Sequence, residues 1–276
     1  MKSKLTLAFV IPAAFLLSAC TDYLAEFQDE YPDEYRAMLL QAEQQGQLPS
    51  EGDISSVAEP PSSSSVAPSS SGGTQSSDGA TLTDARDGQI YKIVTIGTKI
   101  WMAQNLNYKV ANSFCYANEN SNCDRYGRLY LWSAAMDSVG TFSSDGKGCG
   151  FKKECSTPTR VRGVCPEGWH LPTKDEIEDL ANQAGGLQNG ASAAMRAAEG
   201  WSEGENGTDK VGFKGLPAGD RNANGSYANI GKTASFWTST QLNTTNAYYL
   251  NLKPSTSRYM ENDYENKSFS VRCLKD

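Results

Sequence analysis

The chain has 276 residues, with 25 Lys and Arg against 32 Asp and Glu and a formal net charge of −7. Nearly all of the acidic excess lies before residue 81: residues 21–80 hold eleven acidic residues and one basic residue, whereas residues 81–276 hold 21 acidic and 22 basic residues. A nearly neutral C-terminal part lacks the clustered positive charge that phosphate backbones require, which excludes a nucleic-acid-binding function. The length allows one well-packed domain with a tail.

The first residues have the pattern of a lipoprotein signal peptide, residues 1–19. Lys2 and Lys4 precede an apolar run from Leu5 to Leu17, and small residues then lead to Cys20. The apolar run is shorter than the roughly 20 residues that a membrane-spanning helix needs. We therefore expect cleavage before Cys20 and lipidation of its side chain. This predicts a chain whose acyl groups anchor it to the outer membrane, displayed at the cell surface.

Two segments of low apolar content separate the predicted anchor from the folded part. Residues 20–48 are acidic, and from Pro32 their apolar residues recur at helical spacing, so a short amphipathic helix and a solvated spacer are both compatible with the pattern. Residues 49–81 are rich in Ser and Pro and have too little apolar surface to pack. A flexible linker of this length spans roughly 30 Å on average, which would lift a domain away from the membrane.

The folded domain is predicted over residues 82–276 as an α+β unit. Residues 89–96 and 99–102 are typical of two strands joined by a tight Gly-Thr turn. Residues 129–136 are apolar, and their periodicity is compatible with either a buried strand or a buried helix. The last three strands are predicted over residues 236–240, 247–252 and 269–273.

Two short helices are predicted in the middle of the domain. Thr173 is an N-cap residue and Glu176 lies three positions later, which completes a capping box. A Gly-Gly pair at positions 185–186 ends this helix. Ser192 is the predicted N-cap of the second helix, over residues 193–199. The buried stripe of the first helix comprises Ile177, Leu180, Ala181 and Ala184.

Six cysteines remain when the lipidated Cys20 is set aside. An even number in an exported chain predicts three disulfides, for which six cysteines allow fifteen connectivities. A zinc site is the alternative, but the chain has no CxxC pair and only one His. The six cysteines are Cys115, Cys123, Cys149, Cys155, Cys165 and Cys273.

Several short motifs follow one another in order over roughly residues 85–276. They include Asp87-Gly88-Gln89-Ile90-Tyr91, Ile100-Trp101-Met102-Ala103-Gln104-Asn105-Leu106, Gly163-Val164-Cys165-Pro166-Glu167-Gly168-Trp169-His170-Leu171-Pro172, Phe236-Trp237-Thr238-Ser239-Thr240 and Ser270-Val271-Arg272-Cys273. In these motifs the chain resembles the Fibrobacter succinogenes major paralogous domain family of bacterial surface lipoproteins. The resemblance implies a disulfide-braced C-type lectin-like α+β fold with short antiparallel sheets, two short helices and long loops. It implies no particular molecular function, because a fold does not give one.

The resemblance also implies how the cysteines pair. In C-type lectin-like folds a long-range bridge ties the helix region to the last strand, a role that Cys165 and Cys273 fit. In the chain-entropy model, closing so long a loop would stabilise the fold by roughly 4.7 kcal/mol, against roughly 2.5 kcal/mol for a short loop. The remaining cysteines then form two local pairs, Cys115–Cys123 and Cys149–Cys155.

Few residues are candidates for catalysis. His170 is the only histidine, and beside a helix start a packed, hydrogen-bonded imidazole is its expected role. No activated Ser is placed beside it, no glycine-rich phosphate loop is present, and no spacing singles out a carboxylate pair for glycoside hydrolysis. A copper–thiolate site of the formylglycine-generating type would need two free cysteines, whereas all six can be assigned to bridges. We therefore expect a chain that is not an enzyme.

One segment has the pattern of a calcium loop. Asp220, Asn222 and Asn224, followed by Gly225, match the start of an EF-hand loop, but the twelfth position is Gly231 instead of the bidentate Glu. The alternative is a turn-rich surface loop in which Asn and Gly supply left-handed backbone. The Glu-Pro-Asn and Trp-Asn-Asp motifs of calcium-dependent lectins are absent. No cofactor is expected apart from this candidate calcium site.

Aromatic side chains in polar, loop-rich surroundings are the candidates for stacking on sugar rings. These surface candidates are Trp201, Tyr227, Tyr259 and Tyr264. Four tryptophans in apolar strands and family motifs are expected in the core: Trp101, Trp132, Trp169 and Trp237. The leading hypothesis is a binding module for polysaccharide, such as that of plant cell walls. A structural lipoprotein that contacts other envelope proteins is the alternative, and a hydrolase is a third possibility.

Overall fold

The computed structural model describes residues 80–186, 190–254 and 259–276. The predicted signal peptide, the lipidation site Cys20, the acidic segment 20–48 and nearly all of the linker 49–81 lie outside the described residues. The first strand starts at Thr81, so the folded part includes the last residue that was assigned to the linker. Within the described residues, no helix is long and apolar enough to cross a membrane.

The described chain is rich in short strands and has few, short helices, which confirms the α+β class. The strands are β1 (Thr81–Thr83), β2 (Ile90–Ile96), β3 (Lys99–Met102), β4 (Ser113–Phe114), β5 (Leu129–Leu131), β6 (Trp169–His170), β7 (Asp220–Arg221), β8 (Tyr227–Ala228), β9 (Ala234–Asn243), β10 (Asn246–Leu252), β11 (Met260–Tyr264), β12 (Ser268–Phe269) and β13 (Leu274–Lys275). The helices are the 3₁₀ turn η2 (Tyr116–Asn118), α3 (Asn120–Tyr126), α4 (Trp132–Ala135), α5 (Lys174–Gln183) and α6 (Ala191–Met195). This part of the chain thus has four α-helices where two were predicted: α3 is too short to show an apolar period, and α4 lies within residues 129–136, whose periodicity is compatible with a strand or a helix.

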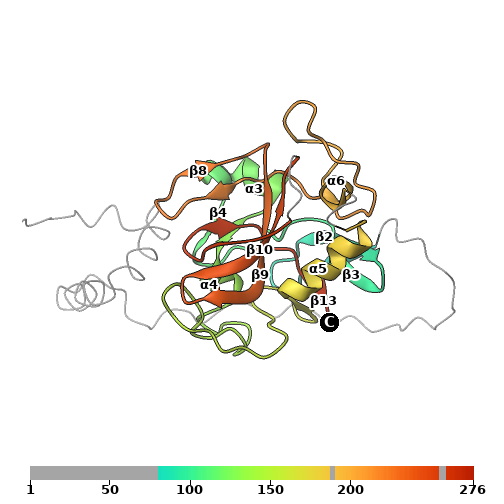
Figure 1. Cartoon of the computed structure of the whole chain (residues 1–276). Coiled ribbons are helices and arrows are strands. Elements are labelled where there is room, and N and C mark those ends of the chain that lie inside the picture. Colours follow the sequence, from blue (N-terminus) through green and yellow to red (C-terminus); the bar gives the residue numbers. More distant parts are fainter. Residues whose placement is uncertain (1–79, 187–189, 255–258) are drawn as a thin grey trace, which may run out of the picture. The chain divides into compact units, whose positions relative to one another are not determined.

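The described strands form three antiparallel sheets, with the orders β1-β2-β3-β13-β6, β11-β10-β9 and β4-β5-β12-β7-β8. In the first sheet, Leu274 of β13 pairs with Trp101 of β3 on one side and with His170 of β6 on the other. Figure 1 shows this meeting of the two ends of the domain, with β13 and the C-terminus close to β3 and α5. The last strand is therefore an inner strand of the first sheet, paired on both sides.

The predicted hairpin of β2 and β3 is confirmed. The two strands pair from Ile93↔Met102 to Ile96↔Lys99, so that only two residues form the turn. The first of these, Gly97, has a φ of +62°. A positive φ at the first central position is typical of a type II′ turn, whose twist matches that of the flanking strands. Neighbouring residues alone therefore determine this element.

Helix α5 begins as its sequence predicts. The Thr173 hydroxyl accepts a hydrogen bond from the Glu176 backbone N–H at 3.2 Å, and the Glu176 carboxylate accepts one from the Thr173 N–H at 3.0 Å. At the other end the Gly186 N–H donates to the Ala181 carbonyl at 2.8 Å, and both glycines there have positive φ. The predicted stripe is buried in one core cluster: Ile177, Leu180, Ala181 and Ala184.

The middle of the domain departs from two local expectations. Residues 129–136 hold both predicted alternatives in succession, strand β5 and then the single turn of α4. The second helix was predicted too late in the chain, because α6 begins at Ala191 and its N-cap is Gly190 instead of Ser192. The Ser192 hydroxyl donates to the Lys253 carbonyl at 2.8 Å. A partner that is distant in the sequence thus engages the side chain that was expected to cap the helix.

The prediction of one last strand over residues 269–273 is also wrong. β12 ends at Phe269 and β13 begins at Leu274, and the two strands belong to different sheets. Between them, the Ser270 carbonyl accepts a hydrogen bond from the Trp237 N–H at 3.1 Å. The chain therefore crosses from one sheet to another, passing beside β9, and local periodicity does not reveal such a crossing.

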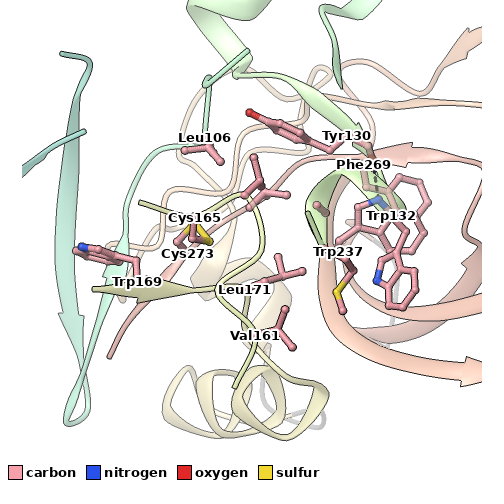
Figure 2. Packing of buried hydrophobic residues seen from close by; sticks show 14 of the residues in the cluster. Leu106, Tyr130, Trp132, Val161, Cys165, Trp169, Leu171, Trp237, Phe269 and Cys273 are labelled. Atoms are coloured by element: carbon pink, nitrogen blue, oxygen red, sulfur yellow. Dashed lines mark hydrogen bonds between the residues drawn. A yellow bond between two sulfur atoms is a disulfide. The ribbon is translucent and has the colours of Figure 1, made fainter. Parts of the chain in front are cut away.

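Two large clusters of buried side chains fill the domain. The four tryptophans predicted in the core are each at most 4% exposed, which confirms that prediction. Trp132 and Trp237 lie beside Phe269, as Figure 2 shows. Their indole N–H groups donate 2.8 Å hydrogen bonds to the carbonyls of Thr238 and Tyr130 respectively. Both bonds fix the indoles against strands that come from distant parts of the chain.

Three disulfides have the pairing that the family resemblance implied: Cys115–Cys123, Cys149–Cys155 and Cys165–Cys273. The Cys165–Cys273 bridge has a sequence separation of 108 residues, and both of its residues are completely buried. In Figure 2 it lies inside the core near Leu106 and Leu171. It therefore ties the segment before α5 to the residue that precedes β13.

We expect the variant Cys165→Ala/Cys273→Ala to lose about 3–5 kcal/mol of unfolding free energy, because it opens the longest loop and leaves a void in the core. The control, Cys115→Ala/Cys123→Ala, opens a loop with a sequence separation of only 8 residues and should lose less. Urea denaturation of the oxidised proteins measures both losses. Equal losses would show that the long bridge has no special role.

Candidate functional site

A polar cavity of about 440 Å³ opens beside the first turn of α5 and the outer half of β9. Six of its nine lining residues are Ser or Thr, and none of the nine carries a charged side chain. We call it the threonine pocket. It is lined by Cys155, Ser156, Thr157, Pro158, Thr159, Thr173, Ser239, Thr240 and Gln241. Hydroxyl groups both donate and accept hydrogen bonds, so the pocket suits a ligand with many neutral polar groups.

Gln241 holds two walls of the threonine pocket together. Its Oε1 accepts a hydrogen bond from the Cys155 N–H at 2.9 Å, and its Nε2 donates to the Lys153 carbonyl at 2.9 Å. The Cys149–Cys155 disulfide closes the same segment covalently. The pocket is therefore built on restrained backbone, although three distant parts of the chain form it.

A buried carboxyl group lies behind Gln241. Glu265 is 2% exposed, its Oε1 accepts from the Gln241 Nε2 at 2.8 Å, and its Oε2 has no hydrogen-bond partner in the described part of the chain. Burial raises the pKa of Glu265 to about 7, and the hydrogen bond from Gln241 offsets this only in part. The group therefore changes charge near neutral pH.

The outer end of the β10–β11 pair is partly exposed to solvent next to the pocket. Across the β10–β11 pair, Tyr248 lies opposite Asn262, and Asn246 lies opposite Tyr264. Directly opposite residues share a face, so all four side chains project from the same side. Tyr264 is 54% exposed. We call these four residues the tyrosine–asparagine face.

Lys174 connects the tyrosine–asparagine face to the threonine pocket. Its backbone N–H donates to the Thr240 hydroxyl at 3.0 Å, and its Nζ lies 5.5 Å from the centre of the Tyr248 ring. The Thr238 hydroxyl, on the same stretch of β9, donates to the Tyr248 carbonyl at 2.8 Å. The two surfaces therefore adjoin, and together they offer hydroxyls, amides and two aromatic rings.

Two of the four aromatic residues predicted at the surface are buried, which corrects that prediction. Trp201 is 7% exposed: its indole N–H donates to the Gly215 carbonyl at 3.1 Å, and the Arg196 guanidinium lies 5.0 Å from its ring. Tyr259 is 6% exposed and belongs to the same core cluster. Both rings are packed into that cluster, so neither ring can stack on an external ligand.

The other two predicted aromatic residues have different surroundings. Tyr227 is half-buried against Tyr116, with ring centres 5.2 Å apart, and its hydroxyl donates to Asn118 at 2.7 Å. Tyr264 is exposed on the tyrosine–asparagine face. Tyr248 was missed by the sequence analysis, although the pair Tyr248-Tyr249 carried a signal. Successive residues of a strand point to opposite faces, so one of two adjacent tyrosines in a half-buried strand must point outward.

The candidate calcium segment forms the hairpin of β7 and β8. Asp220 is buried, and its carboxylate accepts a 2.6 Å hydrogen bond from Asn229. Asn222 and Asn224 instead bond to Ser226 within the turn. In the part of the chain that is described, no group of three or more His, Cys, Asp or Glu could hold a metal ion. The calcium site stays a prediction.

His170 lies between two carboxylates. Its Nδ1 is 2.7 Å from the Asp276 Oδ1, and its Nε2 is 3.2 Å from the Glu176 Oε2. The ring is 2% exposed, which agrees with the packed, hydrogen-bonded imidazole expected from the sequence. Each ring nitrogen therefore lies within hydrogen-bonding distance of a carboxylate oxygen.

Glu176 also lines a cavity of about 270 Å³ beside β13. Burial by itself would raise the pKa of Glu176, but hydrogen bonds from His170 and the Thr173 N–H, together with the nearby Lys99 ammonium, lower it to about 2. The group stays ionised under all mild conditions. It serves at once as the helix cap and as the partner of His170.

Comparison with known protein families identifies the family of the chain. The model of the Fibrobacter succinogenes major domain family matches residues 94–275, which is more than half of the chain. No curated protein and no solved structure matches the chain. The matched range contains the threonine pocket, the tyrosine–asparagine face and His170.

We expect Glu265→Gln to change how stability depends on pH. An unfolded Glu has a pKa of about 4.3, whereas the folded value is about 7, so the folded state retains a proton between these values. Wild-type stability should therefore fall as pH rises from about 4.3 to 7, by about 3 kcal/mol in total. The Gln variant should lack this fall and exceed the wild type at pH 8. Urea denaturation at pH 5 and pH 8 measures it; the exposed Glu203→Gln is the control.

Glu176→Gln should change how stability depends on pH in the acidic range, below about pH 4.3. The pKa of Glu176 is about 2 in the folded chain and about 4.3 when unfolded, so its contribution is present above pH 4.3 and is lost as pH falls toward 2. At pH 7 we expect the variant to lose about 1–3 kcal/mol, because the buried His170 loses a charged partner. At pH 2 the two proteins should be alike. Asp175→Asn, an exposed change in the same helical turn, should be nearly neutral.

Proposed function

The chain belongs to the Fibrobacter succinogenes major domain family, and we propose that it binds polysaccharide without catalysing a reaction. One observation carries the proposal: a hydroxyl-lined cavity adjoins a sheet face that bears two tyrosines and two asparagines. A sugar ring has polar hydroxyl edges and apolar C–H faces. The pocket suits the edges, and the tyrosine rings suit the faces.

The spacing of the tyrosines fits a ligand longer than one sugar. Tyr248 and Tyr264 are diagonal neighbours across the antiparallel β10–β11 pair, a relation that sets residues about 7–8 Å apart. Asn246 and Asn262 lie between them, with the Asn246 Nδ2 3.5 Å from the Asn262 Oδ1. Two rings with amides between them would contact successive units of a chain. A polysaccharide, such as that of plant cell walls, presents such repeated units.

The proposed fold within the α+β class is C-type lectin-like. Three features support it: β13 lies between β3 and β6, the Cys165–Cys273 bridge joins the region before α5 to the end of the chain, and α5 follows a Trp-His-Leu-Pro segment. Folds of this kind present their loops on a disulfide-braced scaffold. This proposal rests on the resemblance in the motifs, and the fold by itself implies no ligand.

The proposed setting is the cell surface. The signal-peptide pattern of residues 1–19 supports lipidation of Cys20 and anchoring in the outer membrane. The Ser- and Pro-rich linker supports a domain carried at a distance from the bilayer, where insoluble polymers would be within reach. A hydrolase is less well supported, because both nitrogens of His170 are engaged and the threonine pocket is lined by no carboxylate.

A second candidate is a structural lipoprotein that contacts other envelope proteins. It is favoured by large apolar side chains at the surface, namely Val139, which is 76% exposed, and Ile90, which is 64% exposed. Exposed apolar residues that occur singly are common in monomeric proteins, so this observation is weaker evidence for a function than the polar surface is.

We expect the full chain to be retained on at least one insoluble polysaccharide, with cellulose and xylan as first probes. Tyr264→Ala and Tyr248→Ala should each weaken binding about 5–10-fold, because an aromatic stacking contact contributes about 1–1.5 kcal/mol. Val139→Ala removes an exposed apolar side chain outside both surfaces and should bind like the wild type. Sedimentation with the insoluble polymer gives the affinities. Absence of retention on every polysaccharide would refute the proposal.

A further inference from the structure

We propose that the ligand of the threonine pocket and the tyrosine–asparagine face is an uncharged polysaccharide, and not a uronic-acid polymer. This inference rests on the proposed function and names the class of ligand. The evidence for this inference is the distribution of charge in and around the two surfaces. Thirteen residues make up these surfaces, and every one of them has a neutral side chain.

The charged groups at the border of the two surfaces are paired within the protein. The Lys174 Nζ lies 2.8 Å from the Glu178 Oε1, within one turn of α5. Asp263, which lies between the two outward residues of β11, bonds to the Lys267 Nζ at 2.7 Å. Neither lysine is available to bind a ligand carboxylate without giving up its own partner. Recognition of carboxylates relies on such cations, because charge-assisted hydrogen bonds to Lys and Arg are the strong ones.

The carboxyl group behind the threonine pocket is a second reason why an anionic ligand is disfavoured. Glu265 is buried beneath Gln241, with no hydrogen bond or ion pair to a cation in the described part of the chain. Since burial raises its pKa to about 7, it is neutral in mild acid and negative in mild base. The potential that it adds at the pocket is therefore zero or negative. An anionic ligand would gain nothing from it at any pH.

Exposed cations lie near the pocket: two lysines that precede Cys155, and Arg160, which follows the lining residue Thr159 and lies 3.7 Å from the Asp276 carboxylate. Lys152 and Lys153 precede the pocket wall that starts at Cys155, and neither side chain lines the pocket. If an acidic polymer bound, Lys152 and Lys153 would be cations able to hold it, since no salt bridge to either is seen in the described part of the chain. They therefore provide the variant that distinguishes the two classes of ligand.

The test is titration calorimetry of the full chain with three soluble oligosaccharides of equal length: cello-, xylo- and galacturono-oligosaccharides. We expect at least one neutral oligosaccharide to bind, with an affinity that changes less than 2-fold between 50 and 500 mM NaCl, because screening acts only on charges. Binding should be unchanged in Lys152→Ala/Lys153→Ala. Thr157→Val, which removes one pocket hydroxyl, should weaken it at least 5-fold, and the exposed Thr208→Val should not.

The outcomes separate the inference from the function on which it rests. Galacturonide binding that equals or exceeds neutral binding, that falls more than 10-fold in high salt and that is lost in the double-lysine variant would overturn the inference while leaving polysaccharide binding intact. If none of the three is bound and the full chain is also not retained on insoluble polymers, both proposals fail. If a neutral oligosaccharide binds and Thr157→Val has no effect, the assignment of the ligand to the pocket is wrong.

Discussion

The buried guanidinium of Arg272 is the interaction on which the architecture depends. The side chain is completely buried, and it donates to the carbonyls of Met102, Phe213 and Lys214 and to the side chain of Asn105. Burial lowers its pKa to about 9, with Asp209 acting in the opposite sense, so it remains charged at neutral pH. A buried cation without these acceptors would be very costly. Two segments far apart in the chain, around residues 102–105 and 213–214, must therefore be in place before the guanidinium can be accommodated.

The burial of Arg272 fixes the path of the chain where it crosses from β12 to β13, and this path in turn fixes the position of β9. The residue after Arg272 is Cys273, whose disulfide to Cys165 closes the long loop. Two residues before Arg272, Ser270 accepts a hydrogen bond from the Trp237 N–H of β9. Because β9 carries one wall of the threonine pocket and flanks β10, both surfaces of the proposed site rest on this crossing. A polar binding surface on a rigid base loses little entropy when a ligand binds.

Two carboxyl groups, the half-buried Glu176 and the buried Glu265, illustrate how partners decide the sign of a pKa shift. Glu176 and Glu265 are both withdrawn from water, which by itself favours the neutral form in each. Glu176 has His170, Lys99 and a backbone N–H around it, and its pKa falls to about 2. Glu265 has only the amide of Gln241, and its pKa rises to about 7. The first is a permanent structural charge, whereas the second leaves the pocket without any fixed charge in mild acid.

The sequence by itself determined the elements that depend on neighbouring residues: the β2–β3 hairpin, the capping box of α5 and the family of the chain. It also indicated the buried tryptophans, because they lie in apolar runs. Only the tertiary structure decided which aromatic rings reach solvent. Trp201 and Tyr259 lie in polar segments and yet are buried, whereas Tyr248 lies in a core strand and is partly exposed. Exposure, the convergence of three segments on one pocket and the protonation of Glu265 all depend on contacts between residues that are far apart in the chain, and local patterns do not encode such contacts.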